Sequence, residues 1–553
     1  MDPAPRQRAP LDGEFFDVVV IGGGVSGTAI ARLCALARRR TLLVEQNDFA
    51  SGTTSRSTRI IHGGLRYLEH GSIALVRESL AERERLLRER PHLVHPMQFL
   101  LALRPNALHN AMTVRAGLWM YRRMAARSGA ATRERNGDAL RQLESALDAG
   151  RHWTLYSYQD AQCSFPERLV AEWVSDAAAA GAVVRNHTHA LKVNRTAGRV
   201  RGLLLRDLLT GAEQTVEAEW IINATGPWAD HVVSDSGIVP NERLVGGVRG
   251  SHIVLPPFDG APNAAVYCEA EDGRPIFVIP WNGTLLVGTT EVRDFSDPSQ
   301  AQPSDDEIDY LLRSLNAVFP QAHVTRRRIL YAFAGVRPLP FAPGKPMSAL
   351  TRHHSLHDHS AEGAAGMISV VGGKLTTAAF VARDVARAIG IRVVEPAIDL
   401  SPGPSEEELE QAVNLGSRQI AQLGHLPRVT ARAMAEWYGV ETSMTMARIA
   451  RASEAARAPL CPHGTHVVAE VLYAMREEFA ITLSDALLRR VPVALGRCWS
   501  RECTRTAAMA IGKAAGWNRK LVEEEIERLE EERARFLVKP AEYAVEKPSG
   551  AVA

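Results

Sequence analysis

A glycine-rich turn near the start of the chain constrains the fold more than any other feature of the sequence. An apolar, valine-rich run over residues 16–21 leads into Gly22-x-Gly24-x-x-Gly27, and a helical stretch follows. A second apolar run over residues 41–44 ends in a glutamate. Strand, tight turn, helix and strand make a βαβ unit. This pattern predicts a dinucleotide-binding fold.

Each part of this motif has a physical role in binding a dinucleotide. Gly22, Gly24 and Gly27 permit the tight turn and let a pyrophosphate approach the backbone. The N-terminus of the helix offers amides and the positive end of a dipole. Glu45, which closes the second strand, can accept hydrogen bonds from the adenosine ribose. The motif alone does not distinguish FAD from NAD.

Two later turns favour FAD. A predicted strand over residues 214–222 runs into Asn223-Ala224-Thr225-Gly226, and a buried strand over residues 367–371 ends in Gly372 and Gly373. Either turn alone is ordinary for glycine. In this order after the N-terminal βαβ unit, they resemble the split FAD domain of the large flavin oxidoreductases. We therefore predict that Ala224, Gly226, Gly372 and Gly373 contact FAD.

A polar, glycine-containing segment, GTTSRSTRIIHGGLRYL, follows the βαβ unit over residues 52–68. Such a loop can wrap around the pyrophosphate and the flavin, although a solvated surface loop is the alternative. The hydroxyls predicted to contact the cofactor belong to Thr53, Ser55 and Ser57. The groups predicted to contact a substrate belong to His62, Arg66 and Tyr67.

The rest of the chain predicts two further domains. Strand signals cluster between about 235 and 350, and the best of them flank Asn282-Gly283, a strong hairpin signal. After the prolines 402 and 404 the sequence becomes helical and highly charged. We expect an α/β (α+β) fold with a Rossmann-type FAD-binding domain, an antiparallel-sheet substrate domain and a C-terminal helical domain. The expected segments are 1–15 as a loose tail, 16–75 with 150–235 and 360–395 as the split FAD-binding domain, 76–149 and 236–359 as the substrate-binding domain, 405–540 as the α-helical domain, and 541–553 as a second loose tail.

Composition restricts the partners of the protein. Lysine plus arginine (65) nearly balances aspartate plus glutamate (63), which gives no indication of a nucleic-acid partner. The six cysteines are scattered without a CxxC pair, so neither a zinc site nor a disulfide framework is indicated, and a reduced cytoplasmic location is favoured. No run approaches the ~20 apolar residues of a membrane-spanning helix. Short basic clusters at Arg122-Arg123, 326–328 and Arg489-Arg490 can meet anionic lipid, or they can be solvated surface.

Seven motifs in order resemble the FAD-dependent glycerol-3-phosphate dehydrogenases. They are IIHGGLRYLEHG (60–71), NATGPW (223–228), GSHIVLP (250–256), FVIPW (277–281), GTTE (288–291), GVRPL (335–339) and GGKLTT (372–377). The later stretch AEVLYAMREEFAITLSDALLRR (469–490) resembles the C-terminal helical domain of that family. The resemblance implies non-covalent FAD, oxidation of sn-glycerol 3-phosphate at C2 to glycerone phosphate, and transfer of electrons to quinone at the membrane surface.

The same resemblance assigns the candidate active-site residues. Arg66 and Tyr67 match positions that face the flavin and the substrate. Arg337 and Lys374 match basic active-site residues, and Arg352 falls where the family keeps a further arginine. A phosphate dianion needs several cationic donors, and arginine binds it with two parallel hydrogen bonds. We expect Arg337 and Arg352 to hold the phosphate, with Arg66 and Lys374 nearer the reacting end.

Oxidation at C2 also needs a base for the hydroxyl proton, and a near-neutral pKa suits that role. His62 and His252 are the candidates, although either can be a core histidine. We favour His62 because it shares a motif with the arginine at position 66. In GGKLTT, Leu375 and Thr376 are also assigned to the flavin site, and the helix that follows should direct its N-terminus toward the flavin ring.

Several positions depart from the family pattern, including the loop over residues 163–168 and the His353-His354 pair. Arg59 and Arg249 stand where lysine is common, which keeps the charge but replaces a point donor with a planar fork. Glu291 replaces a frequent aspartate. Because these residues are expected near the site, they leave the fine substrate specificity open.

Other functions of the same fold also stay open. An oxidase would pass its electrons to oxygen, and an amino-acid or 2-hydroxy-acid oxidoreductase would need fewer cationic residues. A non-catalytic flavin-binding subunit is a third alternative. We expect a cytoplasmic enzyme that is peripheral on the cytoplasmic face of the inner membrane, and we keep an anionic membrane surface and a homodimer as open expectations.

Overall fold

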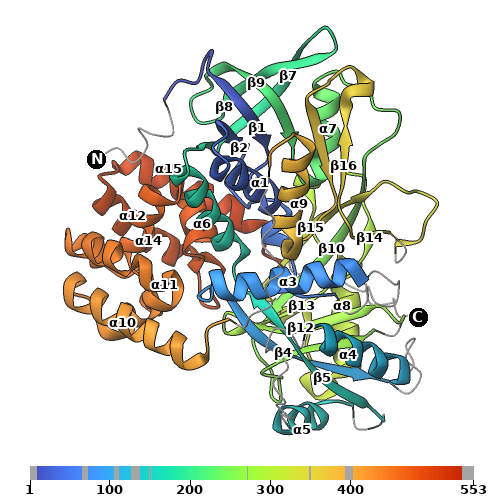
Figure 1. Ribbon diagram of the computed structural model, residues 1–553. Coiled ribbons are helices and arrows are strands. Elements are labelled where there is room, and N and C mark those ends of the chain that lie inside the picture. Colours follow the sequence, from blue (N-terminus) through green and yellow to red (C-terminus); the bar gives the residue numbers. More distant parts are fainter. Residues whose placement is uncertain are drawn as a thin grey trace, which may run out of the picture.

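The structure is a computed structural model, and it describes residues 9–64, 73–104, 111–125, 137–148, 150, 152–270, 272–347, 350–392 and 403–538. Two β-sheets and a group of C-terminal helices form three parts of the molecule (Figure 1). The C-terminal helices, orange and red in the figure, lie to one side of the two sheets. The predicted fold class is confirmed, because the fold is mixed α/β with a C-terminal helical domain.

The first sheet contains the predicted βαβ unit. Its strands, in spatial order, are β16 (Ser355–Asp358), β17 (Met367–Val371), β9 (Glu213–Asn223), β1 (Phe15–Ile21), β2 (Thr41–Val44) and β6 (Val183–Arg185), and β8 (Arg199–Asp207) and β7 (Thr188–Thr196) extend it beside β9. The pairs β1–β2, β1–β9, β17–β9 and β2–β6 are parallel. The carboxyl ends of β1, β9 and β17 therefore meet at one edge, where all three predicted glycine turns lie.

Both faces of this sheet are covered. Val18 and Val20 of β1 share a core with α1 (Val25–Leu36), α6 (Pro166–Ala179) and α9 (Ala378–Ala388). Val19 and Ile21 belong to the opposite core, which includes residues of β7, β8 and α7 (Ala229–Asp235). Because successive residues of a strand point to opposite faces, burial on both faces explains why this run is continuously apolar.

The second sheet is mostly antiparallel. Its strands, in spatial order, are β14 (Val292–Arg293), β10 (Val245–Leu255), β13 (Thr284–Gly288), β12 (Pro275–Trp281), β11 (Ala265–Glu269), β4 (Val94–Leu103), β5 (Thr154–Cys163) and β3 (Ile60–Ile61), and β15 (Tyr331–Pro340) pairs with β10. Asn282 and Gly283 join β12 to β13 with φ angles of 49° and 68°. Two successive positive φ angles favour Asn-Gly, so the predicted hairpin is confirmed.

Further helices pack around this sheet. They are α3 (Ile73–Glu89), α4 (Ala111–Ala125), α5 (Gly137–Ala146) and α8 (Asp305–Val318). α8 begins with a capping box, in which the Ser304 hydroxyl accepts from Glu307 N and the Glu307 carboxylate accepts from Ser304 N. The short 3₁₀ turns that bear on the site are η1 (Thr53–Arg56), η3 (Gly226–Trp228) and η9 (Leu375–Thr377).

The C-terminal part is helical, as predicted. Its elements are α10 (Glu406–Gly424), α11 (Arg428–Arg451), η10 (Ala455–Arg457), α12 (Val468–Glu477), α13 (Leu483–Asp485), the π-helical turn η11 (Ala486–Arg490), η12 (Val493–Leu495), α14 (Arg501–Ala515) and α15 (Arg519–Ala534). These helices share one apolar core with Tyr331 and Phe333 of β15. Ala332 N also donates to Phe536 O at 2.8 Å, which ties the end of this part to the second sheet. No helix among the described residues is long and apolar enough to cross a membrane.

The strand pairing in the two sheets changes some of the expected domain boundaries. β3 and β5 fall in segments expected for the FAD-binding domain, but β5 pairs with β4 along its whole length and so joins the second sheet. β16 was expected in the substrate domain, but it pairs with β17 in the first sheet.

The expected N-terminal tail also needs correction. Leu11 is buried, and Gly13 N donates to Thr215 O at 2.7 Å, so residues 9–14 are held against the first sheet. Residues 1–8 and the second expected tail, 541–553, lie outside the described residues.

Candidate active site

A cavity of about 2170 Å³ is lined by all three parts of the molecule. Ordinary small-molecule pockets have ~300–1,000 Å³, so this cavity has room for a dinucleotide together with a substrate. The predicted site residues that line it are Gly22, Gly24, Glu45, Thr53, Ser57, His62, Ala224, Gly226, His252, Arg337, Arg352, Gly372, Gly373, Lys374, Leu375 and Thr376. Gly27 and Ser55 are not among the lining residues, and Arg66 and Tyr67 lie outside the described residues.

The first glycine turn fits a pyrophosphate. Gly22 has φ 104°, and a Cβ atom there would lie 2.7 Å from Ala224 O. A Cβ atom on Gly27 would lie 1.9 Å from Gly22 O, so Gly27 allows α1 to pack closely on the turn rather than contacting a ligand. Gly24 begins α1 without a side-chain cap. The first-turn amides and the positive helix end therefore lie beside the cavity.

Glu45 lies at the position expected for a ribose acceptor. Its carboxylate accepts hydrogen bonds from Gly23 N at 2.7 Å and from Asn47 N at 2.9 Å, which fixes its orientation. Burial raises the pKa of Glu45, and the bonds from Asn47 and Gly23 oppose that rise. Since each carboxylate oxygen has two lone pairs, acceptor capacity remains for ribose hydroxyls.

The hydroxyls of the polar loop divide into two groups. Thr53 lines the cavity and donates to Val336 O at 2.8 Å, which joins the loop to β15. Ser55 instead donates to Ser51 O and Gly52 O, inside the loop itself. Thr54, which we did not predict, lines the cavity and accepts from Val25 N at 3.1 Å. A loop without periodicity gives no signal for which of its hydroxyls point inward.

The arginine of GVRPL projects from the second sheet into the cavity. The Arg337 guanidinium donates to Thr289 Oγ1 at 2.9 Å. A Cβ atom on Gly250, which faces Gly335 across the β10–β15 ladder, would lie 2.3 Å from Arg337 Nη2. The absence of a side chain at Gly250 therefore leaves room for the Arg337 guanidinium beside β10.

Two further cationic groups line the same cavity. Arg352 donates to Glu291 Oε1 at 2.7 Å, and this ion pair is partly exposed. Burial, and then the charge of Arg352, lower the pKa of Lys374 to about 7, while Glu78 opposes that shift. The Lys374 ammonium thus titrates near neutrality, which sequence reasoning did not anticipate.

The two candidate bases lie in different environments. His62 lines the cavity, and burial lowers its pKa to about 4, with Asp160 opposing and Lys374 and Arg83 reinforcing the shift. The Asp160 carboxylate is itself held by the Tyr121 hydroxyl at 2.7 Å and by the Arg83 guanidinium at 2.6 Å.

His252 is more confined. Its Nε2 lies 3.0 Å from Thr58 Oγ1, and its ring stacks on Phe333 with centroids 5.2 Å apart. Burial and the charges of Arg337 and Arg59 lower its pKa to about 3. Burial thus favours the neutral imidazole at both positions.

The structure explains two departures from the family pattern. Arg59 is buried, and its fork donates to both oxygens of Glu167 at 3.0 Å. Its guanidinium also lies 4.5 Å from the ring centroid of Trp281. Arg249 donates to both Asp294 and Glu307. In both places a planar fork makes contacts that the point charge of lysine cannot reproduce.

The cavity and the turns around it define a flavin-dependent oxidoreductase, because the residues that line it fit a dinucleotide and leave a cationic pocket beside it. Comparisons with known proteins agree. Residues 17–387 match the family model described as FAD dependent oxidoreductase, and residues 405–522 match the C-terminal domain of alpha-glycerophosphate oxidase. The chain is 35% identical over 503 residues to a glycerol-3-phosphate dehydrogenase of Synechocystis sp., covering 89% of this chain and 91% of that protein.

Two further comparisons extend this result. A D-erythritol 1-phosphate dehydrogenase of Brucella abortus is 36% identical over 368 residues, which cover 66% of this chain and 71% of that protein. The solved structure of the glycerol-3-phosphate dehydrogenase from Bacillus halodurans, complexed with FAD, has the same fold, with a TM-score of 0.73 at 24% identity over 95% of this chain and 96% of that one. The chain belongs to the FAD-dependent glycerol-3-phosphate dehydrogenase family, and its cofactor is FAD.

Proposed function

We propose that this protein oxidises sn-glycerol 3-phosphate at C2 to glycerone phosphate. The observation that carries the proposal is the cationic group formed by Arg337, Arg352 and Lys374, which come from separate segments and line the cavity beside the dinucleotide turns. A carboxylate substrate needs fewer cationic donors than a phosphate dianion. The names of the two relatives above, both polyol-phosphate dehydrogenases, support the same substrate class.

In this proposal each residue has a defined role. FAD supplies a two-electron acceptor for the hydride that leaves C2. Arg337 and Arg352 bind the phosphate, and Glu291 holds the Arg352 guanidinium in place. His62 accepts the proton of the C2 hydroxyl, and protonated Lys374 stabilises negative charge at the reacting end. Arg66 and Tyr67 keep their proposed contacts with flavin and substrate, and His252 is the alternative base.

The proposed electron acceptor is membrane quinone, reached from the cytoplasmic face of the inner membrane. Helix α4 supports contact with an anionic lipid surface, because it exposes 72% of Met112 and carries Arg122 and Arg123 in its last turn. Trp119 on the same helix is 65% exposed and also lines the flavin cavity. Exposed apolar and basic side chains on one helix are typical of interfacial binding.

The other two basic clusters do not support this contact. The Arg489 and Arg490 side chains are buried, so that expectation is corrected, and Arg326 pairs with Asp305 and Asp309.

Anaerobic reduction of the bound flavin tests the proposed reaction. Glycerol 3-phosphate is expected to bleach the flavin absorbance under anaerobic conditions, and a water-soluble quinone analogue should restore it faster than air does. D-Erythritol 1-phosphate and glycerol are the comparison substrates. Absence of bleaching with glycerol 3-phosphate would contradict the substrate, and faster recovery in air than with quinone would indicate an oxidase.

The pH dependence of kcat/KM tests the roles of His62 and Lys374. A base must be neutral, so activity should rise with pH through the His62 pKa of about 4. A cationic lysine is lost as pH rises, so activity should fall through the Lys374 pKa of about 7. Replacing His62 with asparagine should lower the rate by roughly 10²–10⁴-fold and abolish the acid limb, leaving the alkaline limb in place.

The matched control replaces His252 with asparagine. For both variants, the rate of flavin reduction is measured by stopped flow after pH jumps. This variant is expected to keep the acid limb. Loss of the acid limb in the His252 variant, with its retention in the His62 variant, would assign the base to His252 instead.

A further inference from the structure

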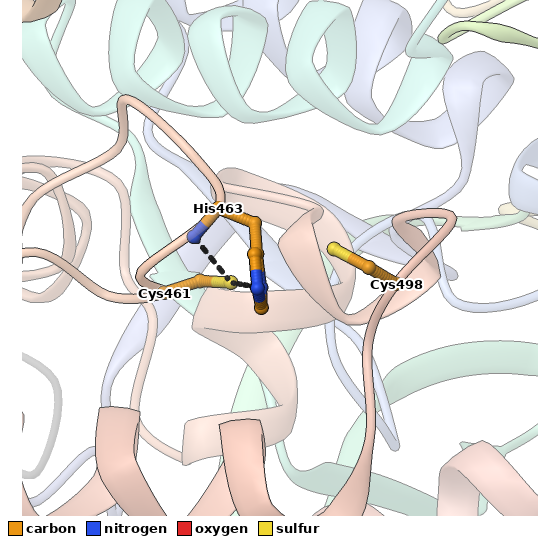
Figure 2. A group of neighbouring side chains, drawn as sticks. All are labelled: Cys461, His463 and Cys498. Atoms are coloured by element: carbon orange, nitrogen blue, oxygen red, sulfur yellow. Dashed lines mark hydrogen bonds between the residues drawn. The ribbon is translucent and has the colours of Figure 1, made fainter.

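Three side chains of metal-ligating type converge in the helical domain, away from the residues that line the flavin cavity (Figure 2). Cys461 and His463 lie in the loop between η10 and α12, and Cys498 lies between η12 and α14. Their ligand atoms all lie within 4.8 Å of one another. Figure 2 shows the Cys498 thiol directed toward the other two side chains. No sequence spacing indicated this group, because the fold brings together cysteines that are far apart in the chain.

A fourth ligand of the same type lies beside them. Cys503 is in the first turn of α14, and its Sγ lies 3.9 Å from Cys498 O. The Ser500 hydroxyl donates to Cys503 Sγ at 3.4 Å, and the Cys503 side chain also forms a hydrogen bond with Cys461. Cys461 and Cys503 are thus in contact.

The geometry suits one small, thiophilic ion. Cys461 Sγ lies 3.7 Å from His463 Nδ1. A tetrahedral zinc site, with bonds of ~2.3 Å to sulfur and ~2.0–2.1 Å to nitrogen, separates its ligand atoms by about 3.3–3.8 Å. The remaining adjustment falls on His463 and Cys498, which are exposed side chains. Ca²⁺ and Mg²⁺ prefer oxygen ligands, so three thiols and an imidazole favour zinc over them.

A second group of potential ligands is explained without a metal. His357, His359 and Glu362 also lie close together. However, Glu362 already accepts from His357 at 2.9 Å and from His359 at 2.8 Å, and His359 Nε2 lies 2.8 Å from Ser369 Oγ. Charge-assisted hydrogen bonds to the Glu362 carboxylate therefore account for that group.

We propose that Cys461, His463, Cys498 and Cys503 bind one Zn²⁺ ion that links the loop after η10 to the start of α14. Each thiol releases a proton on binding and His463 binds as neutral imidazole, so no oxidant or reductant takes part. The ion joins two segments that already pack in the helical core, to which Leu460, Cys461 and Cys503 belong. Its role is structural, and it does not depend on which substrate the flavin site oxidises.

Metal analysis of the full-length flavoprotein, expressed with zinc and iron supplied, tests this proposal. The wild type is expected to hold one zinc ion per chain, and His463→Ala should reduce the content to near zero. His463→Cys should keep the zinc, because a four-cysteine site has the same tetrahedral chemistry. Cys34→Ala, which removes a buried cysteine of α1, is the matched control and should also keep it.

Removal of zinc from the wild type with a chelator avoids any folding defect of the variants. It should lower the Tm of the flavoprotein, and added Zn²⁺ should restore it. Cobalt substitution should give the visible bands of a tetrahedral thiolate site. Three results would overturn the proposal: no zinc bound even on addition to reduced protein, iron with acid-labile sulfide in its place, or a Cys461–Cys498 disulfide in freshly purified protein by mass spectrometry.

Discussion

Replacement of Asp48 with alanine is expected to destabilise the folded protein by about 3–5 kcal/mol, because it removes the carboxylate partner of the buried Arg490 and one of the carboxylates around the buried Arg489, which keeps Asp485 and Glu532. The Asp48 carboxylate accepts from Arg489 Nε at 2.5 Å and from both terminal nitrogens of Arg490 at 2.8 Å. It also accepts from Asn186 at 3.1 Å. The three charged side chains are almost fully buried.

The measurement is the unfolding midpoint by heat and by urea, with and without excess FAD. Asp48 and Arg489 both line the flavin cavity, so excess FAD separates lost stability from lost cofactor. Glu523→Ala is the control, because Glu523 pairs with Arg519 on the exposed face of α15 and should cost at most about 0.5 kcal/mol. Equal midpoints for the two variants would show that the buried network contributes little.

Replacement of Arg337 with glutamine is expected to lower kcat/KM for glycerol 3-phosphate by about 30-fold to 5,000-fold. The estimate corresponds to the ~2–5 kcal/mol lost when one partner of a buried, hydrogen-bonded charge pair is removed. Glutamine retains a polar end but has neither the charge nor the fork that binds a phosphate. Competitive inhibition by inorganic phosphate should weaken in parallel, which locates the effect at the phosphate rather than at C2.

Arg293→Gln is the matched control for this variant. Arg293 lies on β14, which pairs with β10 as β15 does, and its guanidinium donates to Ala342 O outside the residues that line the cavity. It should leave both kcat/KM and phosphate inhibition nearly unchanged. If Arg337→Gln slowed catalysis but left inhibition by phosphate intact, another residue would hold the phosphate.

The parts of the fold that sequence predicted well are local. The βαβ unit, the Asn282-Gly283 hairpin and the glycine turn after β17 each depend on a few neighbouring residues whose backbone conformation is restricted. Pairing between strands that lie far apart in the chain has no comparable signal in the local sequence. β5 is exposed or half-buried over its first six residues and buried over its last four, and nothing in its own residues says which sheet it joins.

The same distinction applies to the site and its surroundings. Glycines and basic residues in motifs predicted most of the cavity lining, but the inward-facing Thr54 was missed because a loop lacks periodicity. Arg489 and Arg490 resembled a surface cluster, since their partner Asp48 lies far away in the sequence. The sequence shows which residues are charged. Whether they are buried depends on contacts with residues far away in the chain, which the sequence alone does not show.

Helix α15, near the end of the chain, supplies Arg528, Glu531 and Glu532 to the wall of the flavin cavity. Domains fold in the order in which the ribosome produces them, so the N-terminal βαβ unit is made long before this wall exists. The cavity therefore has all of its walls only after α15 has been synthesised. A ligand that fills this cavity stabilises the folded state in which the N-terminal turn and α15 lie together.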